Sequence, residues 1–116
     1  MSVRIPVRLG LVLAALTLAP ALAAQAAIAT DQDQVVAIGN FTFDPPTLMV
    51  PAGTQVTWVN HDDIPHTATG ADGGFGSPVL DTDERFSFRF DQPGTYAYFC
   101  KLHPHMSGTI QVTPKG

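Results

Sequence analysis

Three kinds of potential metal ligand lie within seven positions near the C-terminus, in the stretch CKLHPHM. Residues 100–106 hold the only cysteine of the chain, Cys100, together with His103, His105 and Met106. Thiolate and thioether sulfur are soft ligands, and imidazole suits copper or zinc. A buried thiol that stands alone is usually inert packing, but three candidate ligands follow this one closely. The stretch therefore predicts a metal site.

The available ligand types favour copper over zinc. A structural zinc site takes four Cys or His ligands in a closed tetrahedron, whereas two histidines, one cysteine and a weak axial methionine make up a mononuclear blue-copper centre. The second histidine must come from outside the CKLHPHM stretch. His66 is the candidate, since it follows Pro65 shortly after the run VTWVN. His61 is the competitor, but it stands between Asn60 and two aspartates and is expected to face water.

Strands have to position these ligands, because short runs rich in β-branched and aromatic residues follow one another along the chain. We expect a loop leading into a strand over 61–70 and an irregular, glycine-rich segment over 71–80. No stretch after the N-terminal region has a convincing helical period. Short strands separated by proline and glycine turns predict a single all-β domain, either a β-sandwich or a small barrel. The expected strands span residues 34–43, 47–50, 55–60, 85–90, 95–100 and 107–114.

Alternation along these runs predicts which side chains form the core. In RFSFRF the three phenylalanines point inward and the polar residues outward. In TYAYFC the two tyrosines and the cysteine share one face. Such alternation places Cys100 on the inner face, at the end of a strand. The residues expected to point inward are Val56, Trp58, Phe86, Phe88, Phe90, Tyr96, Tyr98, Cys100, Ile110 and Val112.

Residues 1–26 predict a secretory signal peptide. Arg4 and Arg8 give a positive start, an apolar segment runs from 9 to 24, and Ala24-Gln25-Ala26 fits an A-x-A cleavage pattern. Ala21-Leu22-Ala23 is a second possible cleavage site. An uncleaved membrane anchor is the alternative, although the apolar segment is shorter than the about 20 residues of a typical span. Cleavage after residue 26 leaves residues 27–116 as the mature domain, in a periplasm or outside the cell, with no membrane span.

The charge of the mature chain excludes some classes of partner. Removing Arg4 and Arg8 leaves four basic residues against ten acidic ones, a net charge of about −6 with neutral histidines. This charge argues against nucleic acid or an anionic membrane as partner, and it is compatible with a basic or mixed-charge protein. The acidic run at 81–84 is expected to be a solvated turn, with steering of a basic partner as the alternative.

Two long stretches resemble the cupredoxins, the small blue-copper proteins. They are FDPPTLMVPAGTQVTWVNHDDIPHTAT and FRFDQPGTYAYFCKLHPHMSGTIQV, and the likeness runs roughly from Val35 to Val112. The spacing Cys-x-x-His-x-x-Met is similar to that of amicyanin-like members, whereas plastocyanin-like members place the methionine further from the histidine. The resemblance implies a Greek-key β-sandwich with one type 1 copper ion. It implies His66, Cys100, His103 and Met106 as the ligands, and it does not include His61 or His105.

The sequence departs from the family pattern at two positions. Thr67 stands where amicyanin- and plastocyanin-like proteins have an asparagine that helps to tie the two ligand loops together. We therefore expect a less rigid site or a shifted reduction potential, because groups around the ligands tune the metal. His105 replaces an aromatic residue beside the exposed ligand. It is expected to be a solvated loop histidine, with pH dependence at a partner surface as the alternative.

The function that the resemblance implies is single-electron transfer between redox proteins, by a monomer, through the exposed edge of His103. Leu102, Pro104 and Met49 are candidates for an apolar patch around that edge. We do not expect an enzyme, because the ligand set leaves no open position for substrate. A copper-binding or delivery protein without a redox circuit is the main alternative. A domain of a copper enzyme and a β-sandwich adhesion module are the others.

Overall fold

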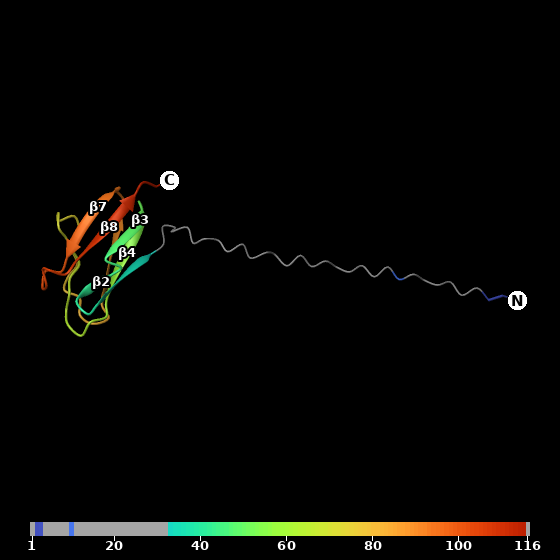
Figure 1. Cartoon of the computed structure of the whole chain (residues 1–116), viewed down its shortest axis with the longest axis horizontal. Helices are drawn as coiled ribbons and strands as arrows, with labels where there is room; N and C mark the ends of the chain where they lie inside the picture. The colour runs from blue at the N-terminus through green and yellow to red at the C-terminus, as the bar shows by residue number, and fades with distance from the viewer. Residues whose placement is uncertain (1, 4–9, 11–32, 116) are drawn as a thin grey trace.

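Two four-stranded sheets pack against each other in the computed structural model, which describes residues 2–3, 10 and 33–115 (Figure 1). The expected signal peptide, with both of its possible cleavage sites, lies outside the described residues apart from positions 2, 3 and 10. The strands are β1 (Gln34–Gly39), β2 (Thr42–Asp44), β3 (Thr47–Pro51), β4 (Thr54–Asn60), β5 (Thr69–Gly70), β6 (Arg85–Phe90), β7 (Gly94–Phe99) and β8 (Ser107–Thr113).

The strand order confirms the predicted all-β sandwich. One sheet runs β2-β1-β4-β6 and the other β3-β8-β7-β5. Both sheets are mixed, since β1 pairs in parallel with β4 and β3 pairs in parallel with β8. The parallel pairs join strands that are distant in sequence, so loops from several parts of the chain meet at the ends of the sandwich. Within the described residues, no helix is long and apolar enough to cross a membrane.

The run predicted as one strand over 34–43 is a hairpin. Gly39 pairs with Thr42, and the chain reverses between them at Asn40 and Phe41. Both turn residues have positive φ, 50° at Asn40 and 59° at Phe41. This conformation costs about 1–2 kcal/mol for a residue with a side chain, and a bulky aromatic residue adopts it rarely. The turn is stabilised from outside, because both of its backbone N–H groups donate to the carboxylate of Asp62.

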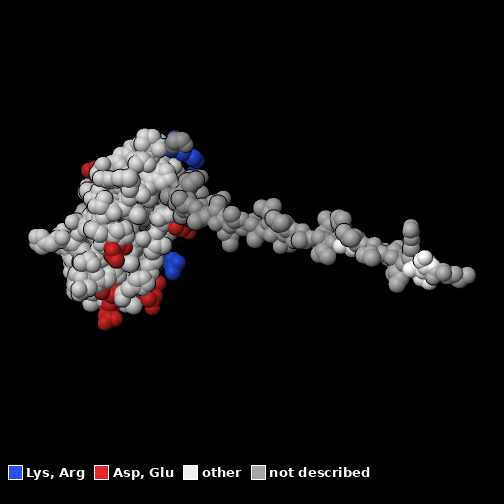
Figure 2. Space-filling view, turned by 45° about the vertical axis from the view of Figure 1, so that its right-hand side comes forward, with Lys and Arg blue, Asp and Glu red and all other residues white. Residues whose placement is uncertain are grey.

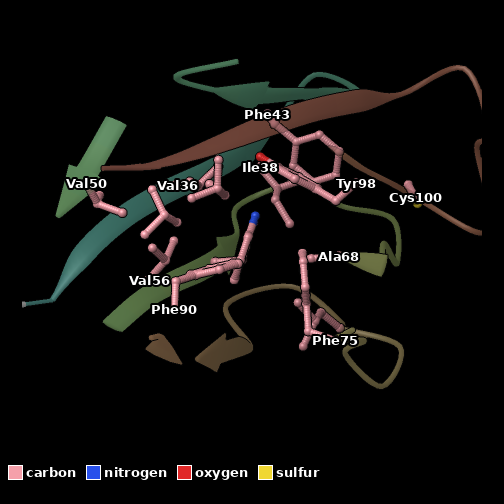
Figure 3. Close-up of a cluster of buried hydrophobic side chains, with 14 of the residues drawn as sticks. Val36, Ile38, Phe43, Val50, Val56, Ala68, Phe75, Phe90, Tyr98 and Cys100 are labelled. Carbon is pink, nitrogen blue, oxygen red and sulfur yellow. The ribbon is translucent and has the colours of Figure 1, made fainter. Parts of the chain in front are cut away.

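The predicted alternation produces the core that fills the sandwich (Figure 3). Trp58 is fully buried and lies at its centre, stacked on Phe75 and edge-on to Tyr98. Phe90 is buried, whereas Phe86 and Phe88 are partly exposed on the outermost strand and pack against the core. Burial of an aromatic side chain of this kind contributes about 2–3 kcal/mol. Figure 3 shows Cys100 at one end of the cluster, so the core continues directly into the candidate site.

Tyr98 lies across the face of its strand partner, Gly108. A Cβ atom at position 108 would overlap the Tyr98 hydroxyl, so only glycine leaves room for the phenol ring. Burial raises the pKa of Tyr98 to about 12. Tyr98 is buried in the core two residues before Cys100, so its ring lies close to the start of the loop that carries the candidate ligands.

Candidate metal centre

The loop from Cys100 to Met106 connects β7 to β8 and is closed by its own backbone. Cys100 N–H donates to the Met106 carbonyl at 3.0 Å, and Phe99 pairs with Ser107 just below. Inside the loop, His103 N–H donates to the Cys100 carbonyl at 3.2 Å and Met106 N–H donates to the His103 carbonyl at 2.9 Å. These turns place the Cys100 and Met106 side chains at the neck of the loop, where both are buried. His103 lies at the rim and is partly exposed.

His66 reaches the same place from the segment between β4 and β5. It is fixed by a two-way backbone bridge to Leu80, with N···O distances of 3.0 and 2.8 Å. Its side chain is fully buried. The ring nitrogen Nδ1 lies 3.6 Å from the Sγ atom of Cys100. The structure therefore brings together the two predicted ligands that are 34 positions apart in the sequence.

Asp62 determines which nitrogen of His66 is free to bind a ligand. Its Oδ2 atom lies 2.7 Å from Nε2 of His66. An ionised carboxylate only accepts hydrogen bonds, so Nε2 carries the proton and Nδ1 presents its lone pair towards Cys100. Hydrogen bonds lower the pKa of the Asp62 carboxyl, the one from the Phe41 amide most strongly, and partial burial opposes them. The carboxylate is therefore ionised at neutral pH.

Thr67 connects the two loops that carry the predicted ligands. Its backbone N–H donates to Cys100 Sγ at 3.3 Å. Its hydroxyl oxygen accepts the Lys101 N–H at 2.8 Å and lies 3.0 Å from the Thr69 hydroxyl. The threonine hydroxyl thus makes a link between the loops.

Phe41 lies against both histidines, and the sequence reasoning overlooked it. Its ring meets His66 edge-on with centroids 5.7 Å apart, and His103 edge-on at 5.1 Å. The His66 and His103 rings are themselves 5.1 Å apart. Asp62 was also overlooked as a contact of the site. For Asp62, the only hint in the sequence was its position four residues before His66. No sequence signal pointed to Phe41, because the turn that presents it depends on tertiary contacts.

The remaining histidines lie outside this arrangement. His61 is exposed, as expected, with Nδ1 4.0 Å from an oxygen of Asp83, and His105 is exposed in the loop. Over the described residues, no group of three or more His, Cys, Asp or Glu side chains is gathered closely enough to hold a metal ion. The His66–Cys100 pair is in contact, and His103 lies beside His66.

Acidic side chains gather at one end of the domain. Figure 2 shows Asp and Glu atoms gathered over the lower end of the domain, where the segment after β4 lies in Figure 1. The acidic residues of this end are Asp62, Asp63, Asp81, Asp83 and Glu84. All are exposed apart from Asp62, which is partly buried. The run at 81–84 is therefore a solvated turn, as expected, and its negative charge lies near the candidate site.

A family model described as a cupredoxin-like domain matches residues 11–112. The amicyanin-alpha of Methylorubrum extorquens is 34% identical over 109 residues, which cover 86% of this chain and 92% of that protein. The solved structure of a purple cupredoxin from Nitrosopumilus maritimus is 35% identical, with a TM-score of 0.66, and covers 70% of this chain and 100% of that one. The family model covers both candidate ligand loops.

A copper-containing nitrite reductase from Thermus scotoductus also matches. It is 34% identical with a TM-score of 0.66, over 71% of this chain and 22% of that one. The domain thus occurs both as a small protein and as part of a larger copper enzyme. The match of the family model over most of the chain, the amicyanin relative and the sandwich structure together show that this chain belongs to the cupredoxin family.

Proposed function

We propose that the chain is a small blue-copper electron-transfer protein. In this proposal one copper ion is held by His66, Cys100, His103 and Met106. The observation that carries it is the contact between His66 Nδ1 and Cys100 Sγ at 3.6 Å, formed by side chains that are both fully buried. Membership of the cupredoxin family supports the same reading.

The donor set fits copper chemically. Two imidazoles, one thiolate and a weak thioether suit an ion that alternates between Cu(I) and Cu(II), and such an ion supplies single-electron transfer when it is bound. Cys100 is prepared for metal binding by the Thr67 N–H on its sulfur. His66 is prepared by Asp62, which leaves its Nδ1 atom available. Met106 is buried beside the loop neck, where its thioether is shielded from water.

Electrons would enter and leave at His103. It is the partly exposed member of the proposed ligand set, and its ring lies against Phe41, which is 52% exposed. Leu102 is exposed on the same loop. An apolar rim of this kind allows a redox partner to exclude water and approach the histidine edge.

The first test is a visible spectrum of the purified mature protein with one equivalent of Cu(II), before and after ascorbate. We expect an intense blue band from sulfur-to-copper charge transfer that is bleached by reduction and restored by oxidation. Cys100→Ser should bind copper without that band, because the sulfur ligand is gone. A colourless wild-type protein, or a band retained by Cys100→Ser, would contradict the proposal.

Two further measurements separate the carrier from its alternatives. Fast electron self-exchange, together with slow loss of copper to a chelator, favours a carrier over a delivery protein. Rapid copper transfer without self-exchange would reverse that conclusion. Turnover of nitrite by the isolated copper-loaded protein would instead favour an enzyme.

We further propose that the protein is exported through a signal peptide at residues 1–26 and acts as a monomer in the periplasm or outside the cell. The family membership is compatible with export. Mass spectrometry of the exported protein should give a mature chain that begins near residue 27. Size-exclusion chromatography should give the mass of one mature chain.

A further inference from the structure

Asp62 differs from the other acidic residues at this end of the domain because its carboxylate is held at both oxygens. One oxygen accepts the Asn40 N–H. The other accepts the Phe41 N–H at 3.0 Å and the His66 Nε2–H at 2.7 Å. Its neighbour Asp63 is exposed and makes no comparable contact among those the structure describes.

The backbone of Asp62 is held as firmly as its side chain. Its N–H donates to Oδ1 of Asn60 at 2.9 Å, and its carbonyl accepts the Thr82 hydroxyl at 2.6 Å. Asn60 is itself fully buried, and its amide nitrogen donates to the carbonyls of Ile64 and Leu80. The carboxylate is thus fixed relative to the frame that holds His66.

We propose that Asp62 is the positioning residue of the centre: its carboxylate fixes the His66 ring and lowers the reduction potential of the copper. This inference rests on the proposed copper function. A carboxylate hydrogen-bonded to the far nitrogen of a ligand histidine fixes the tautomer and raises the basicity of the imidazole. A nearby negative charge also stabilises Cu(II) more than Cu(I), because the Coulomb energy increases with the charge of the ion.

The competing explanation is that Asp62 only stabilises the Asn40–Phe41 turn. Both residues of that turn have positive φ, and the carboxylate pairs both of their N–H groups. A carboxylate that only stabilises this turn would affect folding stability but not the electron-donating strength of His66. The reduction potential and the tautomer of His66 therefore separate the two roles.

The test compares Asp62→Asn with Asp63→Asn in the copper-loaded protein. Both variants lose one negative charge at adjacent positions, but only the first changes the contact with His66. We expect Asp62→Asn to raise the preference for Cu(I) over Cu(II) about tenfold, which corresponds to about 59 mV for a one-electron couple. Asp63→Asn should raise it by much less. Equal shifts in the two variants, or no shift in Asp62→Asn, would overturn the proposal.

A second measurement needs neither copper nor a variant. Nitrogen-15 NMR of the metal-free wild-type protein reports which nitrogen of His66 carries the proton. We expect the proton on Nε2, and a proton on Nδ1 alone would overturn the proposal even if Asp62→Asn failed to fold. Failure of the copper function is recognised separately, because it would remove the blue band of the wild type without altering the tautomer.

Discussion

The hydroxyl of Thr67 accepts a hydrogen bond from the Lys101 amide at 2.8 Å, although the two residues are 34 positions apart. This bond joins the segment that carries His66 to the loop that begins at Cys100. The same threonine donates its own N–H to Cys100 Sγ. One residue thus holds both ligand loops in register and contacts the sulfur directly.

Removing that hydroxyl should destabilise the fold. Thr67→Val keeps the shape of the side chain but removes the acceptor of the part-buried bond from the Lys101 N–H, at a cost of about 0.5–1.5 kcal/mol. Urea unfolding of the metal-free protein measures the loss. Thr95→Val, at an exposed strand position, is the control and should change stability by less than about 0.5 kcal/mol. Equal stability of the two variants would mean that the link contributes nothing.

The two histidines of the CKLHPHM stretch should behave differently. His103→Ala removes a proposed ligand at the rim, so the blue band should be lost and then partly restored by added imidazole, which can occupy the opened position. His105→Ala should keep the band, because His105 is exposed and lies outside the ring contacts. Visible titration with copper checks both variants. If the band were lost in His105→Ala but kept in His103→Ala, His105 rather than His103 would be the ligand.

The thioether of Met106 should tune the centre without being needed to form it. Met106→Leu is nearly volume-conserving and should cost less than about 1.5 kcal/mol of stability. We expect the blue band to remain and the reduction potential to rise, because a donor to the copper is removed. Voltammetry measures the shift, with Met49→Leu as control, since Met49 is 63% exposed. An unchanged potential in Met106→Leu would exclude the sulfur as a ligand.

The core beneath the site should not tolerate a side chain at position 108. In Gly108→Ala the new Cβ would overlap the Tyr98 phenol, and relief of such overpacking costs about 1–3 kcal/mol. Gly39→Ala is the matched control on another strand, since its Cβ would meet nothing within 4 Å. In urea unfolding, the free energy of unfolding should be clearly lower for Gly108→Ala than for Gly39→Ala. Adding Tyr98→Phe should recover part of the loss, because the hydroxyl is the atom nearest to the new Cβ.

The sequence by itself determined the all-β class, most of the inward-facing residues and the types of candidate ligand. Alternation in RFSFRF and TYAYFC is a local property, because successive side chains of a strand point to opposite faces. The spacing within CKLHPHM is local too. These features could therefore be predicted without any knowledge of which strands are neighbours. The family resemblance rested on the same stretches.

Only the tertiary structure decided how the candidate ligands are held. The hairpin at Asn40 and Phe41 replaces a predicted continuous strand, because the Asp62 carboxylate, more than 20 positions away, stabilises its positive φ angles. That carboxylate also contacts Nε2 of His66. These contacts join segments brought together by the parallel pairing of β1 with β4. A hydrogen bond depends on a distance in space, and a periodic pattern along one strand carries no information about that distance.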